Sequence, residues 1–240
     1  MTDKQSLTGL LEIAHDRLCP SITNPNYLVL RRRRLILGQW LESIPGQSLA
    51  VLDIGGRYQP YRPLVQHRIQ RYVALDVVTT PLVDVLGTGE QLPFKSDTFD
   101  LVLATGVFEY FPEPRVAAAE IHRILKPGGF LLMSVAAVCP RAADAEHWHY
   151  LPAGLKFVLA PFARTEIVPE VTSIGGFLRL NAWSLSIFAK YGFLRQILHH
   201  TLVPVLNIVG LGLEGAGLSH NDQVTGNYSA LAQKAGSSGP

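Results

Sequence analysis

Cysteine is scarce in this sequence: of 240 residues only two are cysteines, Cys19 and Cys139, and they lie far apart. This excludes a disulfide framework and a Cys-x-x-Cys metal or redox motif. We expect both thiols to be small core residues of a protein in a reducing, cytosolic compartment. The first residues also lack a basic start followed by an apolar run, so no signal peptide is expected.

An excess of charge is also missing. The 21 basic and 19 acidic residues leave a net charge of +2, so nothing attracts the whole chain to nucleic acid, and no nucleic-acid partner is expected. Four arginines are consecutive, Arg31–Arg34, within a helix expected over 27–42. Since they point in all directions around the helix, we expect solvated arginines with packed stems. Contact with phosphates or an anionic membrane is the alternative.

The stretch 49–61 organises the chain. It begins as a short apolar run, which predicts a strand buried on both faces. The strand ends in Asp53, and Gly55 and Gly56 follow before the next helix. Glycine at such a turn lets a ligand approach the backbone, and in a parallel sheet ligands bind beyond the carboxyl ends of the strands. A tight turn in some other α/β protein is the alternative.

The commonest nucleotide motif does not fit this turn. The dinucleotide pattern Gly-x-Gly-x-x-Gly fails because Arg57 and Pro60 occupy its third and sixth positions, which disfavours a nicotinamide oxidoreductase. A second short apolar strand, Tyr72–Asp76, ends in an acid about twenty residues beyond the glycine turn. We therefore expect Asp76 to accept hydrogen bonds from the two ribose hydroxyls of a nucleoside.

Two further segments carry a family resemblance. Residues 87–102 contain Gly-Thr-Gly-Glu-Gln-Leu-Pro-Phe and then Phe-Asp-Leu-Val, and residues 123–129 read Arg-Ile-Leu-Lys-Pro-Gly-Gly. Together with the glycine turn and the ribose acid, this order resembles class I S-adenosylmethionine-dependent methyltransferases. The chain departs from the family at Arg57 and Gln59, which replace glycines, and at Thr88, which replaces an aspartate.

The resemblance implies a Rossmann-like α/β fold with a seven-stranded, mostly parallel sheet in the order 3-2-1-4-5-7-6. It implies S-adenosylmethionine as cofactor and methyl transfer to a small-molecule or glycan acceptor at oxygen. Residues 145–155, an aromatic-rich loop that ends in Pro-Ala-Gly-Leu, resemble methyltransferases found among bacterial polysaccharide genes, and this resemblance suggests the glycan. A non-catalytic cofactor-binding or scaffold protein is the alternative. The residues expected to bind the cofactor are Asp53, Gly55, Gly56, Asp76, Thr88, Gly89, Glu90 and Thr105.

A hydroxyl acceptor needs a proton acceptor, and three side chains qualify. Glu109 follows the fourth expected strand, and His147 and His149 follow the fifth. We favour His149, because Pro152 begins a helix close by and the pKa of histidine lies near working pH. The alternatives are helix capping by Glu109 and packing of the histidines on neighbouring aromatic rings. No further ligand stands at convincing spacing, so no metal site is expected.

The expected organisation is an N-terminal helical extension over 1–45, a methyltransferase domain over 46–234 with a hydrophobic helical insertion at 175–221, and a disordered tail at 235–240. Helices are expected at 5–18, 27–42, 60–69, from 114 and from 152, and strands at 49–53, 72–76, 82–86, 99–105, 130–137, 166–173 and 227–234.

The apolar run Ile197–Leu213 contains Pro204 and polar residues, and we expect it to be too short and broken to span a membrane. A hydrophobic cap, an oligomer contact or a peripheral membrane contact through 194–218 are the open alternatives. The expected location is the cytoplasm, with a peripheral position at the inner face of the membrane as an option. The oligomeric state stays open.

Overall fold

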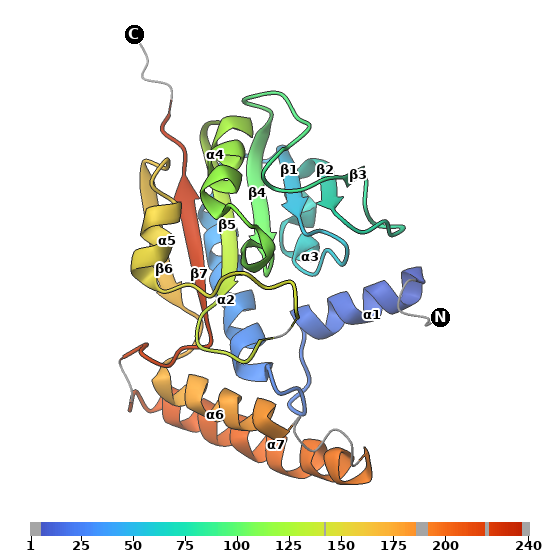
Figure 1. Cartoon of the computed structure of the whole chain (residues 1–240), viewed down its shortest axis with the longest axis vertical. Helices are drawn as coiled ribbons and strands as arrows, with labels where there is room; N and C mark the ends of the chain where they lie inside the picture. The colour runs from blue at the N-terminus through green and yellow to red at the C-terminus, as the bar shows by residue number, and fades with distance from the viewer. Residues whose placement is uncertain (1–5, 142, 186–191, 219–220, 237–240) are drawn as a thin grey trace.

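One sheet forms the centre of the protein. The computed structural model describes residues 6–141, 143–185, 192–218 and 221–236, and within them a seven-stranded sheet has the order β3-β2-β1-β4-β5-β7-β6 (Figure 1). β7 is antiparallel to both of its neighbours, and the other neighbouring pairs are parallel. The predicted strand order is confirmed. The strands are β1 (Leu49–Ile54), β2 (Ile69–Asp76), β3 (Val85–Leu86), β4 (Phe99–Thr105), β5 (Leu125–Ala136), β6 (Arg164–Pro169) and β7 (Asn227–Gln233).

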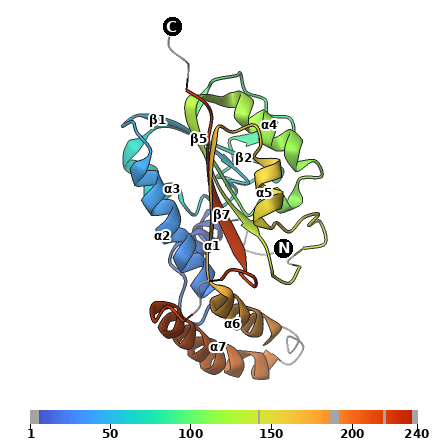
Figure 2. The same ribbon diagram turned by 90° about the vertical axis from the view of Figure 1, so that its left-hand side faces the viewer.

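Helices cover both faces of this sheet. Figure 2 shows α2 and α3 on one side and α4 and α5 on the other. Pro114 and Pro152 each occupy the first position of a helix, where the missing N–H removes no helical hydrogen bond. The helices are α1 (Leu7–Leu18), α2 (Tyr27–Ser43), α3 (Arg62–Val65), α4 (Pro114–Ile124), α5 (Pro152–Val158), α6 (Ser173–Ser184) and α7 (Gly192–Gly215).

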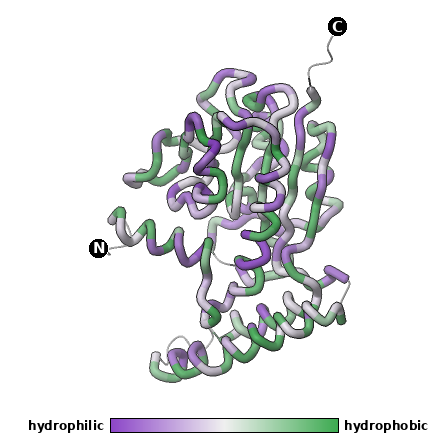
Figure 3. The backbone as a smooth tube through the Cα atoms, turned by 180° about the vertical axis from the view of Figure 1, so that it is seen from behind, coloured by the Kyte–Doolittle hydropathy of each residue, from purple (hydrophilic) through white to green (hydrophobic). Residues whose placement is uncertain are grey.

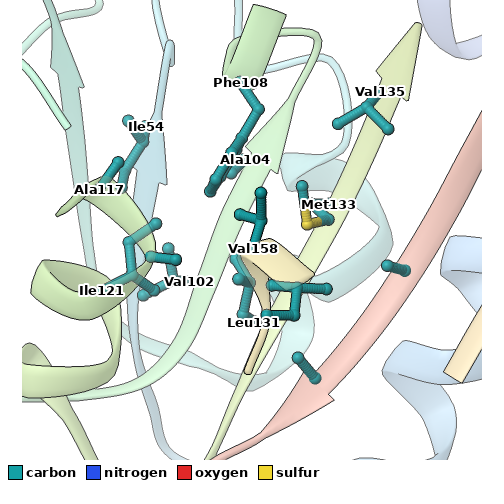
Figure 4. Close-up of a cluster of buried hydrophobic side chains, with 14 of the residues drawn as sticks. Ile54, Val102, Ala104, Phe108, Ala117, Ile121, Leu131, Met133, Val135 and Val158 are labelled. Carbon is teal, nitrogen blue, oxygen red and sulfur yellow. The ribbon is translucent and has the colours of Figure 1, made fainter. Parts of the chain in front are cut away.

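The core lies in two layers, one on each face of the sheet. On one face Ile121 of α4 belongs to a buried cluster with Val102 and Met133 of the central strands (Figure 4). On the other face Leu37 of α2 belongs to a second cluster with Val51. Strands buried on both faces need apolar residues on both faces, so the central strands are near-continuous apolar runs in the sequence.

The chain between β1 and β2 differs from the prediction. A helix over 60–69 is expected, but α3 ends at Val65 and a 3-10 turn leads directly into β2. Arg68 accounts for this ending. Its buried guanidinium donates to the carbonyl oxygens of Leu41 and Gly46, at 2.6 and 2.8 Å, and so ties the turn to the end of α2.

Two predicted strands are shorter than expected. The strand over 82–86 is reduced to β3, and the strand over 166–173 ends at Pro169. Thr172 does not continue the ladder, because its N–H donates to Glu214 of α7 at 2.8 Å and it is the N-cap of α6. The sheet therefore ends where the helical pair begins.

The apolar run near the C-terminal end forms one continuous helix, α7, with Pro204 inside it. The expectation of a short, broken segment is wrong: α7 has 24 residues and, by length and composition alone, could cross a membrane. Only 17% of its most apolar window is buried inside the protein. Apolar residues run along this helix in Figure 3, away from the sheet.

The predicted regions can be placed on the structure. α1 and α2 lie within the expected extension 1–45, and α6 begins two residues before the expected insertion 175–221. Each of these regions, and the tail 235–240, includes residues outside the described ranges. The division into regions stays a prediction.

A buried ion pair joins α2 to the sheet. Glu170 is fully buried, and one of its oxygens accepts from Arg33 Nε at 2.9 Å, from Ser134 Oγ at 2.5 Å and from Ser229 Oγ at 2.8 Å. The expectation of four solvated arginines is therefore wrong for Arg33, whose pKa this carboxylate raises although burial opposes the charge. The network connects α2, β5 and β7.

We predict that Glu170→Gln lowers the free energy of unfolding by about 3–5 kcal/mol, because it leaves the Arg33 cation buried without a counter-ion. Chemical denaturation measures the change. The matched control is Asp97→Asn, which breaks the exposed pair with Lys234 and should cost about 1 kcal/mol or less. Equal losses in the two variants would contradict a structural role for the Arg33–Glu170 pair.

Candidate functional site

Two adjoining cavities open at the carboxyl edge of the parallel strands. The β1–β2 cavity, of about 490 Å³, is lined by residues that follow β1, β2, β3 and β4, among them Gly55, Asp76 and Thr88. The β4–β5 cavity, of about 380 Å³, is lined by residues after β4, at the end of β5 and on α1, α2 and α6. Both sizes suit small-molecule ligands. The lining residues common to both cavities are Arg17, Thr105, Gly106 and Tyr110.

The glycine turn after β1 forms one wall of the β1–β2 cavity. Gly55 has φ +78°, and a Cβ there would lie 3.1 Å from the side chain of Val107. Gly56 is not among the lining residues; a Cβ there would lie 2.8 Å from the carbonyl oxygen of Asp53. Gly55 therefore shapes the cavity wall, whereas Gly56 allows the turn to pack on the strand behind it.

Asp53 lies beneath the turn and does not line the cavity. It is buried, and Tyr72 Oη donates to its Oδ2 at 2.6 Å. The pKa of Asp53 is raised to about 7: burial raises it most, the Tyr72 hydrogen bond lowers it, and the neighbouring Asp76 raises it. The predicted contact between Asp53 and a cofactor is therefore not direct in this arrangement.

Asp76 lines the β1–β2 cavity at the end of β2, as predicted. Its Oδ2 accepts from Arg57 Nε at 3.0 Å and its Oδ1 accepts from the N–H of Val78 at 3.0 Å. Sequence reasoning treated Arg57 only as a missing glycine and overlooked this ion pair. Arg57 also lines the cavity, so a ribose at Asp76 would share the carboxylate with the arginine or displace it.

The segment after β3 closes the opposite wall. Thr88, Gly89 and Glu90 all line the β1–β2 cavity, as the resemblance implied. Gly89 packs under a ring, since a Cβ there would lie 2.4 Å from Phe111. Glu90 Oε1 is 3.5 Å from the N–H of Glu113, a long hydrogen bond that leaves acceptor capacity. A carboxylate at one end and apolar walls between suit a nucleoside, so this cavity fits the cofactor that the resemblance implies.

Glu109 is the sequence candidate that lies in the β4–β5 cavity. It is buried in a 3-10 turn after β4, where one carboxylate oxygen accepts from the N–H of Ala136. The other oxygen, Oε2, has no hydrogen-bond partner among the described residues. Burial is the main reason that its pKa rises to about 7. Glu113, rather than Glu109, is the N-cap of α4, so the capping alternative is wrong.

The two histidines lie elsewhere. Neither His147 nor His149 lines either cavity, and both are exposed. His149 Nε2 lies 3.6 Å from Glu146 and 3.9 Å from the Cys139 sulfur. Cys139 is partly exposed and Cys19 exposed, so neither thiol is the core residue expected. Within the described residues no cluster of three or more His, Cys, Asp or Glu could hold a metal ion.

The β4–β5 cavity concentrates unpaired polar atoms. Five buried side-chain polar atoms lack a hydrogen-bond partner within the described part of the chain, and four of them belong to residues that line this cavity. Buried polar groups are nearly always paired, so such a group needs an explanation, and a bound polar molecule supplies one. Of the four residues that carry these atoms, only Glu109 is identified from the sequence, because the spacing of the other three forms no motif. The four atoms are Tyr61 Oη, Glu109 Oε2, Arg179 Nη1 and Asn227 Oδ1.

The seven-stranded sheet in the order β3-β2-β1-β4-β5-β7-β6 has the Rossmann-like fold of solved methyltransferase structures. Residues 52–133 match the family model described as a methyltransferase domain. This match, over residues 52–133 of 240, supports a class I S-adenosylmethionine-dependent methyltransferase, and a solved structure of similar fold contains S-adenosyl-L-methionine.

One protein of similar sequence and two solved structures of similar fold show what this chain resembles. Over 47 residues, 20% of this chain, the sequence is 43% identical to the chloroplastic 2-methyl-6-phytyl-1,4-hydroquinone methyltransferase 2 of Oryza sativa subsp. japonica, and the match spans 14% of that protein. The structure of Haemonchus contortus phosphoethanolamine N-methyltransferase 2 is 14% identical, has a TM-score of 0.54 and is matched over 98% of this chain and 59% of that one. The cyclase SpnF is 19% identical with a TM-score of 0.52, over 84% and 80% of the two chains. These two structures show a shared fold.

We predict that Asp76→Ala raises the Kd for S-adenosylhomocysteine by about 5- to 150-fold, the equivalent of losing hydrogen bonds to a charged group. Calorimetry measures the affinity, and thermal unfolding checks that the variant stays folded. Asp144→Ala, at an exposed carboxylate outside both cavities, serves as the control. Unchanged affinity in Asp76→Ala would remove Asp76 from the cofactor site.

Proposed function

We propose that this protein transfers the methyl group of S-adenosylmethionine to a hydroxyl group of a small molecule held in the β4–β5 cavity. The observation that carries the proposal is the unpaired Glu109 carboxylate oxygen, buried in the cavity that adjoins the nucleoside-sized one. Thr105 and Gly106 line both cavities, so two ligands would meet at the end of β4. Bringing two reactants together in this way is the main contribution of such a site.

The chain's own residues have separate tasks in this proposal. Asp76, Thr88 and Glu90 bind and orient the nucleoside end of the cofactor, and the packed turn at Gly55 sets its depth. When bound, S-adenosylmethionine supplies an electrophilic methyl group and leaves as the thioether S-adenosylhomocysteine. Glu109 accepts the proton that the acceptor hydroxyl loses as its oxygen bonds to the methyl carbon.

Glu109 replaces His149 as the favoured proton acceptor. Its carboxylate lines the cavity, whereas the exposed imidazoles of His147 and His149 line neither cavity. The main chain also fixes the loop that carries the histidines, because the Glu109 carbonyl oxygen accepts from the N–H groups of His147 and Trp148 at 2.8 and 3.2 Å. The two histidines therefore lie on a loop that the Glu109 carbonyl oxygen holds in place, and their imidazoles take no part in the proposed step.

A non-catalytic cofactor-binding protein is the second candidate. The Arg57–Asp76 ion pair favours it, because this pair occupies the carboxylate that a ribose would need. The same fold occurs in the cyclase SpnF, so the fold alone does not fix the reaction. Binding of S-adenosylmethionine without turnover on any hydroxylated small molecule would favour this candidate.

Two finer expectations remain proposals. A glycan acceptor rests on the sequence resemblance alone. Peripheral membrane contact through 194–218 is supported by exposed apolar side chains on α7, such as Val205 and Ile208, which are 53% and 60% exposed. An amphipathic helix of this kind binds a lipid interface through its apolar face. Such contact would place the protein at the inner face of the cytoplasmic membrane.

We predict that Glu109→Gln lowers turnover by about 10²- to 10⁴-fold, the usual contribution of a positioned base, and leaves cofactor affinity unchanged. A screen of hydroxylated acceptors with methyl-labelled cofactor provides the assay. Because Glu109 must be ionised to accept a proton and burial raises its pKa to about 7, wild-type turnover should rise as the pH increases through about 7 and then level off.

His147→Ala and His149→Ala provide the comparison for Glu109. Both should retain the same pH dependence as the wild type, since neither imidazole lines the cavity. Full turnover in Glu109→Gln, or a pH midpoint that disappears in His149→Ala, would return the proton-accepting role to the histidine.

For the membrane proposal, we predict that the double variant Val205→Glu/Ile208→Glu loses sedimentation with phosphatidylglycerol vesicles. Two charges on this face would have to enter the lipid interface. Val116→Glu, at an exposed position of α4, is the control and should sediment like the wild type. A wild-type protein that stays in the supernatant would refute the membrane contact.

A further inference from the structure

The β4–β5 cavity has a positively charged end. Arg179 of α6 and Arg33 of α2 both line it, and Arg17 of α1 lies where the two cavities meet. These arginines come from three helices, of which α6 is far from α1 and α2 in the sequence. Their convergence on one cavity is a property of the folded chain.

The charge of Arg33 is compensated but that of Arg179 is not. Arg33 pairs with the buried Glu170 carboxylate at 2.9 Å. No ion pair within 4.0 Å joins Arg179 to a carboxylate among the described residues. Its Nε donates to the neutral Asn26 Oδ1 at 2.9 Å, and its Nη1 has no partner in the described part of the chain. With only 8% of its surface exposed, this cation also has little water around it.

The charged groups around Arg179, among the residues that the structure describes, also leave its guanidinium without a carboxylate partner. Burial lowers its pKa most; Cys139, which also accepts a hydrogen bond from this side chain, raises the pKa, the nearby Arg33 cation lowers it and Glu170 raises it. The carboxylates that line the cavity are Asp16, Glu109 and Glu146, and none of them pairs with this guanidinium. An arginine held in this way is a site for an anion that the protein itself does not supply.

The guanidinium is also held in a fixed position. Asn26 Oδ1 accepts from both Arg179 and Trp183 Nε1 at 2.9 Å, which ties α6 to the start of α2. A Cβ at Gly226 would lie 2.4 Å from Arg179 Nη1, so the guanidinium lies directly against the Gly226 backbone. A side chain that is packed and hydrogen-bonded before the ligand arrives loses little conformational freedom on binding.

We infer that the acceptor carries a carboxylate or phosphate group, and that Arg179 binds this anion while Arg33 strengthens the positive potential around it. The inference rests on the proposed function and specifies its substrate class. Arg179 and Glu109 line the same cavity, so the anion anchored at one would leave a hydroxyl of the same molecule to approach the other. Tyr61 and Asn227 offer further hydrogen bonds to the polar groups between them.

Calorimetry tests the inference without any methyl transfer. The probes are phenyl phosphate and benzoate, with benzyl alcohol as the neutral analogue, titrated into protein saturated with S-adenosylhomocysteine. We expect at least one anion to bind about tenfold tighter than benzyl alcohol, as a charge-assisted hydrogen bond allows. Arg179→Gln should abolish that preference and leave the affinity for S-adenosylhomocysteine unchanged.

Two further variants test whether the preference for an anion depends specifically on Arg179. Arg32→Gln, at an exposed arginine of α2 that lines neither cavity, should keep the preference for the anion. Gly226→Ala displaces the guanidinium without removing its charge, so it should lower the affinity for the anion and leave the affinity for benzyl alcohol unchanged. This variant also replaces Arg179→Gln in the test if Arg179→Gln does not fold. Anions that bind no tighter than benzyl alcohol would overturn the inference.

Two outcomes separate the inference from the proposed function. If Arg179→Gln lowers the affinity for S-adenosylhomocysteine as strongly as the affinity for the anion, the arginine binds the carboxylate of the cofactor and the inference fails. If the wild type does not bind S-adenosylhomocysteine at all, the proposed function fails. Titration of the anions into cofactor-free protein then still decides whether Arg179 binds an anion.

Discussion

The buried ion pair between Arg33 and Glu170 is the constraint on which the rest of the site depends. Its carboxylate lies at the point where β6 gives way to α6, and its arginine lies in the helix that packs on the sheet. One contact therefore fixes α2 against β5 and β7. Because Asn26 at the start of α2 holds Arg179 and Trp183, the position of α6 follows from the same contact. Both of these helices, α2 and α6, line the β4–β5 cavity.

The fold could be predicted because its signals are local. An apolar run, an acid and two glycines at 49–61 specify a buried strand and a turn, and the strand over 99–105 was predicted to the residue. The errors arose where a distant residue decided the structure. Arg68 shortened the helix before β2 by bonding to the end of α2, and no local pattern contains that contact. α7 stayed continuous through Pro204, which the apolar pattern alone could not establish.

The two cavities of the site differ in the same way: one is built from local sequence signals and the other from contacts between distant residues. The β1–β2 cavity is built from turns that directly follow strands, so Asp76 and Thr88 could be found by their place in the order of elements. The β4–β5 cavity is built from α1, α2, α6 and the ends of two strands. Arg179 and Asn227 have no spacing relation to Glu109, so only the folded chain brings them together. Even Arg57 was recognised as a departure from a motif and not as the partner of Asp76.

The position of the two cavities has a consequence for how this protein could change over evolutionary time. The β1–β2 cavity is lined mostly by the ends of the central strands and the turns after them, and Ile54 and Leu75 in its lining also belong to the buried core. Much of the β4–β5 cavity is carried by helices outside the sheet, and it meets the first cavity at Thr105 and Gly106. Under the proposed function, substitutions on α1, α2 or α6 would therefore exchange one acceptor for another while the residues of the β1–β2 cavity stayed unchanged. Selection could act on substrate choice and on cofactor use almost independently.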